Sequence, residues 1–128
     1  MDGLRVATIA AVLCVAGCSR QDRQLQDHHD AFASLSASTK MMVEVWLEGS
    51  TSGTYTLTAL EQMFLMVEQE RSALAASPNL LIDQRGAAIA DSASQLSRQI
   101  ASMLTDVRSA DGDGARRHVE QLPFGSKS

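Results

Sequence analysis

The sequence predicts an all-α fold, specifically an up-down-up three-helix bundle with a short C-terminal fourth helix. Three observations support this. The chain has only two prolines among its 128 residues, its 45% apolar content is too high for a disordered chain, and apolar residues recur at alternating steps of three and four. The formal net charge is −4, with no basic block. The phosphate-neutralising surface that nucleic-acid binding needs is therefore missing, and we expect no nucleic-acid partner.

The first element is an unbroken run of small and apolar residues from Val6 to Ala16, which follows Arg5. A helix needs about 20 apolar residues to cross a bilayer, so this run is too short to span one. Its length is typical of the apolar region of a secretory signal peptide. A buried core helix is the alternative interpretation.

The end of this run carries a short motif, made of Val15, Ala16, Gly17 and Cys18. It resembles the lipobox of bacterial lipoprotein precursors, in which an aliphatic residue and two small residues precede an obligatory cysteine. The resemblance covers the signal segment only. It implies that residues 1–17 are removed as a lipoprotein signal peptide, and that Cys18 then carries diacylglycerol on its sulfur and an N-acyl lipid such as palmitate. An ordinary secretory signal remains the alternative.

The same resemblance implies a place in the cell envelope, lipid-anchored in the cell membrane or the outer membrane and facing the periplasm or the exterior. Ser19 stands where aspartate would signal inner-membrane retention in enteric bacteria, which favours the outer membrane. Cys14 would leave with the signal and Cys18 would carry lipid. The mature chain would then have no thiol to form a disulfide.

Beyond the signal segment, the sequence predicts a lipidated tether over residues 18–24, a helical bundle over residues 25–122 and a C-terminal tail over residues 123–128. Three stripes of helical period define the bundle. Their members are Leu25, His28, Phe32, Leu35, Thr39, Met42 and Trp46; then Leu57, Leu60, Phe64, Val67, Arg71 and Leu74; then Ile82, Gly86, Ile89, Ala93, Leu96, Ile100, Met103 and Val107.

The ends of the helices have their own signals. Residues 49–53, rich in Gly and Ser, end the first helix, and Thr58 and Glu61 are spaced as a capping box for the second. The third helix can start at Ser77, which precedes a proline, or at Asp83, and the sequence does not decide between them.

A helix break at residues 111–114 separates the third helix from a final one of one or two turns. Asp111, Asp113 and Glu120 match three positions of an EF-hand calcium loop, but Ser109 stands where the first aspartate ligand belongs. We therefore predict that the aspartates cap the final helix, and we keep these three residues as weak metal candidates only.

The densest apolar stretch of the second helix cannot bury all its side chains, because consecutive helical residues point about 100° apart. Trp46, Phe64 and Met66 are therefore a candidate surface for an envelope protein partner or a second copy of the chain. In the alternative, residues 119–124 fold back over the end where the first helix stops and the second begins.

Charged residues also fall on the predicted apolar stripes. His28 and Arg71 belong to the same end of the bundle, and we expect them to join a salt-bridge cluster that closes it. A pH-responsive or ligand-binding pocket is the alternative. Four carboxylates are available as partners: Asp30, Glu68, Glu70 and Asp83. The adjacent His28 and His29 lack the spacing of three or four by which helical histidines converge on a metal.

No arrangement of residues predicts catalysis. The sequence has no Gly-rich phosphate loop, no nucleophile motif and no haem attachment motif. We therefore expect a non-enzymatic, membrane-anchored lipoprotein that acts through protein contact, with no cofactor besides its covalent lipid. The alternative is a periplasmic module that binds or senses a small ligand or a cation, such as calcium, zinc or copper.

Overall fold

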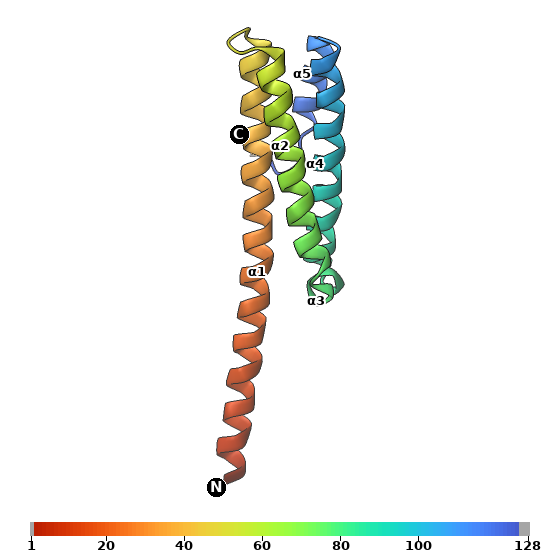
Figure 1. Ribbon diagram of the computed structural model, residues 1–128. Helices are drawn as coiled ribbons and strands as arrows, with labels where there is room; N and C mark the ends of the chain where they lie inside the picture. The colour runs from red at the N-terminus through yellow and green to blue at the C-terminus, as the bar shows by residue number, and fades with distance from the viewer. Residues whose placement is uncertain (1, 126–128) are drawn as a thin grey trace.

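The computed structural model describes the backbone of residues 2–125 and the side chains of residues 20–125. Five helices make up this part of the chain and no strand occurs in it, which confirms the all-α prediction (Figure 1). The helices are α1 (Asp2–Leu47), α2 (Gly53–Ala75), α3 (Pro78–Ile82), α4 (Gln84–Arg108) and α5 (Gly112–Glu120).

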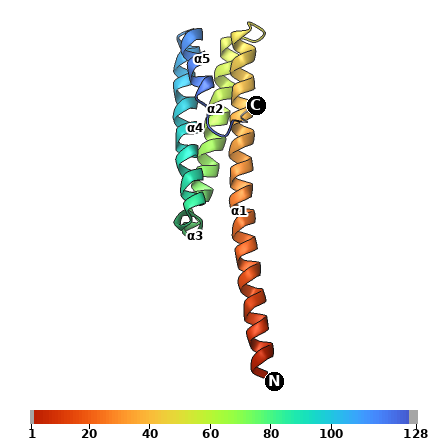
Figure 2. The same cartoon turned by 180° about the vertical axis from the view of Figure 1, so that it is seen from behind.

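The three long helices lie side by side, with α2 packed against both α1 and α4 (Figures 1 and 2). The short α3 forms one end of the bundle. The short α5 packs against α4 and also contacts α1. The N-terminal part of α1 continues well past α3, so the longest helix extends beyond the bundle at that end.

The α4 side of the core is built from the predicted stripe. In α4, every member of the stripe from Gly86 to Val107 is buried. Ile82 is the exception, because its side chain is 86% exposed. It is the last residue of α3, and the chain turns at Asp83 before α4 begins, so Ile82 does not continue the α4 stripe.

The start of α2 differs from the prediction. Ser52 is the N-cap, and its side chain accepts a hydrogen bond of 3.1 Å from the backbone N–H of Tyr55. Thr58 lies inside the helix and its hydroxyl donates to the carbonyl oxygen of Thr54. The capping box at Thr58 and Glu61 is therefore wrong, since Ser52 already satisfies the first turn.

Both predicted starts of the third segment are used, one for each of two helices. Pro78 occupies the first turn of α3. Asp83 caps α4, where its carboxylate accepts a hydrogen bond of 2.8 Å from the backbone N–H of Arg85. The α3–α4 corner is tight, because a Cβ at Gly86 would lie 2.7 Å from the carbonyl carbon of Leu80.

The C-terminal segment folds back, but not over the end of the bundle where α1 stops. After α4 the chain passes through Ala110 in a left-handed conformation, with φ of 55°, and α5 returns along the bundle. This return carries Phe124 to Phe32, where the two rings stack with centroids 5.5 Å apart. The hydroxyl of Ser36 donates to the carbonyl oxygen of Pro123 over 2.6 Å. The tail therefore covers the middle of α1.

Candidate functional site

The proposed lipidation motif, Val15 to Cys18, belongs to α1 by its backbone. Its side chains lie outside the described residues, as do residues 126–128 of the tail. The lipidation of Cys18 therefore stays a prediction from the sequence.

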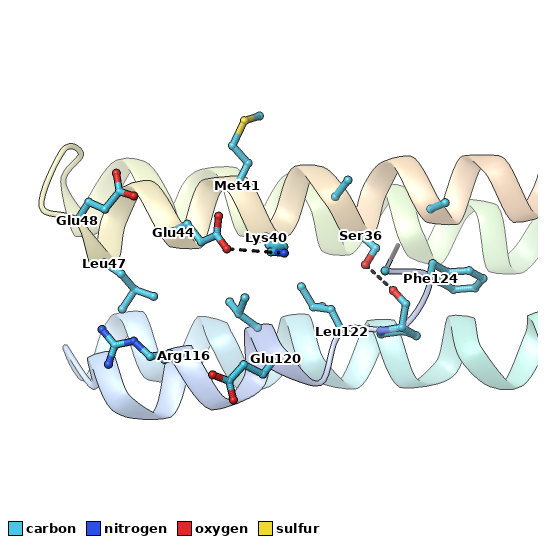
Figure 3. Close-up of a pocket in the computed structure, with 15 residues that line it drawn as sticks. Ser36, Lys40, Met41, Glu44, Leu47, Glu48, Arg116, Glu120, Leu122 and Phe124 are labelled. Atoms are coloured by element: carbon cyan, nitrogen blue, oxygen red, sulfur yellow. Dashed lines mark hydrogen bonds and ion pairs between the residues drawn. The ribbon is translucent and has the colours of Figure 1, made fainter. Parts of the chain in front are cut away.

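A groove of about 1510 Å³ separates α1 from α5 and the tail (Figure 3). Leu47 and Leu122 point into the gap between the helices. Lys40 and Glu44 line the α1 side and pair with each other over 4.0 Å. Aliphatic side chains next to charged ones suit contact with an amphipathic segment, because both kinds of group then find partners.

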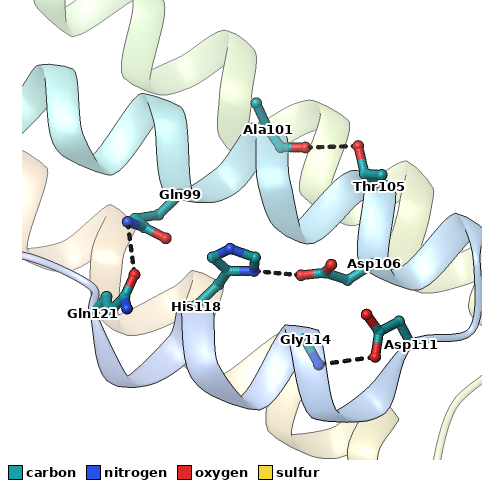
Figure 4. Close-up of polar contacts among 8 residues, drawn as sticks. All are labelled: Gln99, Ala101, Thr105, Asp106, Asp111, Gly114, His118 and Gln121. Carbon is teal, nitrogen blue, oxygen red and sulfur yellow. Dashed lines mark hydrogen bonds and ion pairs between the residues drawn. The ribbon is translucent and has the colours of Figure 1, made fainter.

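The strongest polar link between α4 and α5 is a histidine–aspartate pair (Figure 4). His118 Nδ1 lies 2.5 Å from Asp106 Oδ2, and Asp106 is buried within α4. A buried carboxylate is costly unless it is hydrogen-bonded, so this pair fixes α5 on α4. Next to it, the side-chain amide of Gln99 donates to the side-chain oxygen of Gln121 over 3.3 Å.

The predicted charge cluster at the end of the bundle forms two separate pairs. His28 Nδ1 lies 2.8 Å from Glu70 Oε1, which joins α1 to α2. Arg71 donates to Glu68 over 2.6 Å and to the hydroxyl of Ser94 over 3.0 Å, which joins α2 to α4. Glu70 and Arg71 are consecutive and therefore reach different neighbours of α2. His28 and Arg71, the two polar residues of the apolar stripes that were predicted to join this cluster, thus both have partners.

Glu68 is also held by α4. The hydroxyl of Ser97 donates to Glu68 Oε1 over 2.5 Å. This hydrogen bond, with the hydrogen bond and positive charge of Arg71, lowers the pKa of Glu68 below its ordinary value, although burial acts in the opposite direction. Glu68 therefore stays ionised to a lower pH than a free glutamate and holds both helices together.

The calcium-loop candidates have other roles in the structure. Asp111 caps α5 by accepting a hydrogen bond of 2.9 Å from the backbone N–H of Gly114, as predicted. Asp113 pairs with Arg116 over 3.2 Å, and Glu120 stands at the far end of α5, about 12 Å along the helix. Within residues 20–125, no three His, Cys, Asp or Glu side chains gather closely enough to hold a metal ion.

The three residues of the candidate partner surface do not share one patch. Trp46 and Phe64 are partly buried against the core, whereas Met66 is 46% exposed. Phe64 and Met66 are two positions apart on α2, which turns them about 200° from each other. Among residues 20–125, the large apolar side chains that are exposed are Met41, Tyr55, Leu65, Met66 and Ile82.

Sequence reasoning missed the pairing of Asp106 with His118. A signal was present, because both residues stand within seven positions of the helix break at Asp111. A helix that reverses at this break brings residues on its two sides together. The pairing of Ser97 with Glu68 had no such signal, since it depends on how α2 and α4 are rotated against each other.

Comparison of the chain with models of protein families, with curated proteins and with solved structures finds no match. In the part of the chain that the structure describes, no helix combines the length and apolarity that a membrane crossing requires.

Proposed function

We propose that this chain is the precursor of a lipid-anchored envelope protein that works by protein contact and not by catalysis. The observation that carries the proposal is the motif that ends in Cys18, directly after the apolar run from Val6 to Ala16. Two or three acyl chains at about 0.8 kcal/mol per buried methylene hold a protein stably at a membrane, where a single chain does not. The remainder of the chain, in this proposal, is an up-down-up three-helix bundle at the membrane surface.

The contact face that we favour is the outer side of α2. Tyr55, Leu65 and Met66 are each between 46% and 67% exposed there. Tyr55 and Met66 are eleven positions apart, which is close to three full turns, so the two side chains lie on one line along the helix. This face replaces the surface formed by Trp46, Phe64 and Met66, because only Met66 of those three is exposed.

Intact-mass spectrometry of the full chain expressed in a bacterium tests the anchor. The wild-type protein should lose Met1 to Gly17 and gain the mass of a diacylglyceryl group. The Cys18→Ala variant should show neither change. An unprocessed mass for the wild-type protein would contradict the proposal and favour a buried helix for the apolar run.

Site-specific photo-crosslinking in cells tests the contact face. A crosslinker at Met66 should capture one defined partner, either an envelope protein or a second copy of the chain. A crosslinker at Ala101, an exposed residue of α4, is the matched control and should capture none. The Tyr55→Glu variant should remove the product at position 66. The same product from both positions would show that the outer face of α2 is not the contact.

A further inference from the structure

After α5 the chain crosses to α1 and covers one end of the groove between these two helices (Figure 3). Gln121 caps the end of α5 and is held by α4, because its backbone oxygen accepts a hydrogen bond of 3.3 Å from the side chain of Gln95. Pro123 already lies against α1, where its carbonyl oxygen accepts the hydrogen bond from Ser36. We call residues 122–125 the strap, since they join α5 to α1 across the groove.

The strap places one aromatic ring in a slot on α1. Phe124 stacks on Phe32 at an interplanar angle of 18°, and it meets the ring of His29 edge-on with centroids 5.5 Å apart. Phe32 is fully buried, whereas Phe124 is only partly buried. Stacked and edge-to-face arrangements are the ones that aromatic rings favour. The slot formed by His29, Phe32 and Ser36 therefore suits an aromatic side chain next to a backbone carbonyl group.

The strap occupies this slot at a conformational cost. Phe124 has a φ of 62°, in the left-handed region that bulky residues rarely adopt. Only residues 121–123 separate it from the last residue of α5. A second copy of the chain would bring its own Phe124 on the same short connection. A segment of another protein is free of this connection and can present an aromatic ring from a relaxed backbone.

The groove continues beyond the strap. From the level of the strap to Leu47 it follows α1 for about 17 Å. Lys40 and Glu44 line its α1 wall, and Arg116 and Glu120 line its α5 wall. Each wall thus offers one cation and one anion beside the aliphatic side chains. A segment longer than the strap therefore gains contacts that the strap does not make, if it carries charges of both signs beside an apolar stripe.

We propose that the slot on α1 is a docking site for an aromatic residue in a peptide segment of another protein, and that the strap is its intramolecular competitor. The aromatic side chain of the partner replaces Phe124 against Phe32, and the rest of its segment continues into the groove. Without the partner, the strap closes the slot and shields Phe32 from water. This site lies apart from the outer face of α2 and does not depend on the anchor at Cys18.

A synthetic peptide with the sequence of residues 121–128 tests the slot, because it carries the ring and the carbonyl group that the slot already holds. The full chain and its Phe124→Ala variant are each titrated with millimolar peptide and followed by NMR. In the variant, the peptide should shift the amide resonances of residues 29–36. The wild-type chain should bind the peptide about tenfold more weakly or less, because its slot is open for only a small fraction of the time.

Two controls accompany the titration. A peptide whose phenylalanine is replaced by alanine should cause no shifts. Ser36→Ala, added to the Phe124→Ala variant, should weaken binding by about two- to tenfold, as expected for the loss of one hydrogen bond. Pro123→Gly keeps the ring but makes the released strap more flexible, which favours the open slot. It takes the place of Phe124→Ala if that variant loses its helical circular dichroism.

Three outcomes would overturn the inference. A folded variant whose resonances do not move would show that the strap is a fixed part of the core and that the slot takes no other ligand. Equal binding by the wild-type chain and the variant would show that the strap does not compete with the peptide. A wild-type dimer in analytical ultracentrifugation that Phe124→Ala converts to a monomer would assign the slot to the strap of a second copy.

Discussion

Gly86 lies directly against the backbone of Leu80 in α3, so it gives the sharpest prediction at the scale of one side chain. Gly86→Ala should destabilise the protein by about 1–3 kcal/mol, because the new methyl group would meet the backbone carbonyl of Leu80, which cannot move aside as a side chain could. Alanine also raises helix propensity by about 1 kcal/mol, but this gain is smaller than the cost of the clash over most of the expected range. Urea unfolding measures the difference.

Gly53→Ala is the matched control, since a Cβ there meets only Trp46 at an ordinary 3.8 Å. It should leave the free energy of unfolding unchanged or slightly raised. Equal effects of the two substitutions would contradict the tight corner between α3 and α4.

A second residue-scale prediction concerns Glu68, whose pKa is lowered by Ser97 and Arg71. A carboxylate with a lowered pKa stabilises the fold fully above its ordinary pKa of 4.5, and this contribution is lost as the pH falls through the lowered value. Glu68→Gln should therefore unfold at lower urea concentration than wild type at about pH 7, and the gap should narrow at about pH 3. Glu61→Gln, at an exposed site of the same helix, should change little at either pH. A gap that is constant with pH would show that Glu68 acts through packing alone.

At the scale of helices, periodicity predicted the elements well and their junctions poorly. The α4 stripe from Gly86 to Val107 is buried as predicted, because a long amphipathic helix repeats its signal many times. Ile82 fits the same spacing, yet it does not belong to α4, because the chain turns at Asp83 and the helix begins after that residue.

Two residues of α1, Ser36 and Val43, are buried although they lie outside its predicted stripe. Ser36 contacts the tail, and no local pattern in α1 reveals that the tail returns to it.

The candidate site was less predictable than the helices, because it also depends on contacts between segments that are far apart in the sequence. Contacts within a helix turn, such as the hydrogen bond from the backbone N–H of Gly114 to the Asp111 carboxylate, follow from spacing. The exposure of Trp46 and Phe64 depends on how each helix is rotated in the bundle, which the sequence of one helix does not determine. Of the three residues predicted as a partner surface, Met66 is exposed, whereas Trp46 and Phe64 pack against the core.

The docking of α5 gives a prediction for one element. Asp106→Ala should remove the hydrogen-bond partner of His118 and loosen the packing of α5 on α4. We expect the free energy of unfolding to fall by about 1–3 kcal/mol. Asp106→Asn keeps an oxygen that can accept the hydrogen bond and should cost less. Hydrogen exchange of the backbone amides should show α5 losing protection in the alanine variant while α2 keeps it. Loss of protection that is equal in both helices would mean that α5 is not a separate unit.

The same element bears on the alternative of a cation sensor. Asp111 caps α5 and Asp113 pairs with Arg116, so neither is arranged with Glu120 around one point. We expect that millimolar calcium, or micromolar zinc or copper, leaves the melting temperature of the protein unchanged. A ligand present at a hundred times its dissociation constant would add about 2.7 kcal/mol of stability. A clear rise in melting temperature with any of these ions would support the sensor instead.

The molecule as a whole combines a long helix with a shorter bundle. α1 has 46 residues and α2 has 23, so α1 is about twice as long. In the part of α1 whose side chains are described, the first buried residue is Leu25. Residues 20–24 precede it and contribute no buried side chain, although they continue the same helix. We therefore expect the boundary of the folded domain near Leu25, inside a continuous helix.

Limited proteolysis of the full chain tests this boundary. A helical segment without tertiary contacts is only marginally stable, because the unfavourable free energy of helix nucleation is not offset by packing. Trypsin should therefore cleave first at Arg20 or Arg23, and a fragment that begins at residue 21 or 24 should persist. Arg98 is the internal control. It is also exposed, but it stands in α4 next to the buried residues Leu96 and Ser97. Cleavage at Arg98 as fast as at Arg20 would contradict a domain boundary at Leu25. Persistence of the full chain would show that residues 20–24 are held by a surface of the bundle or by a second copy.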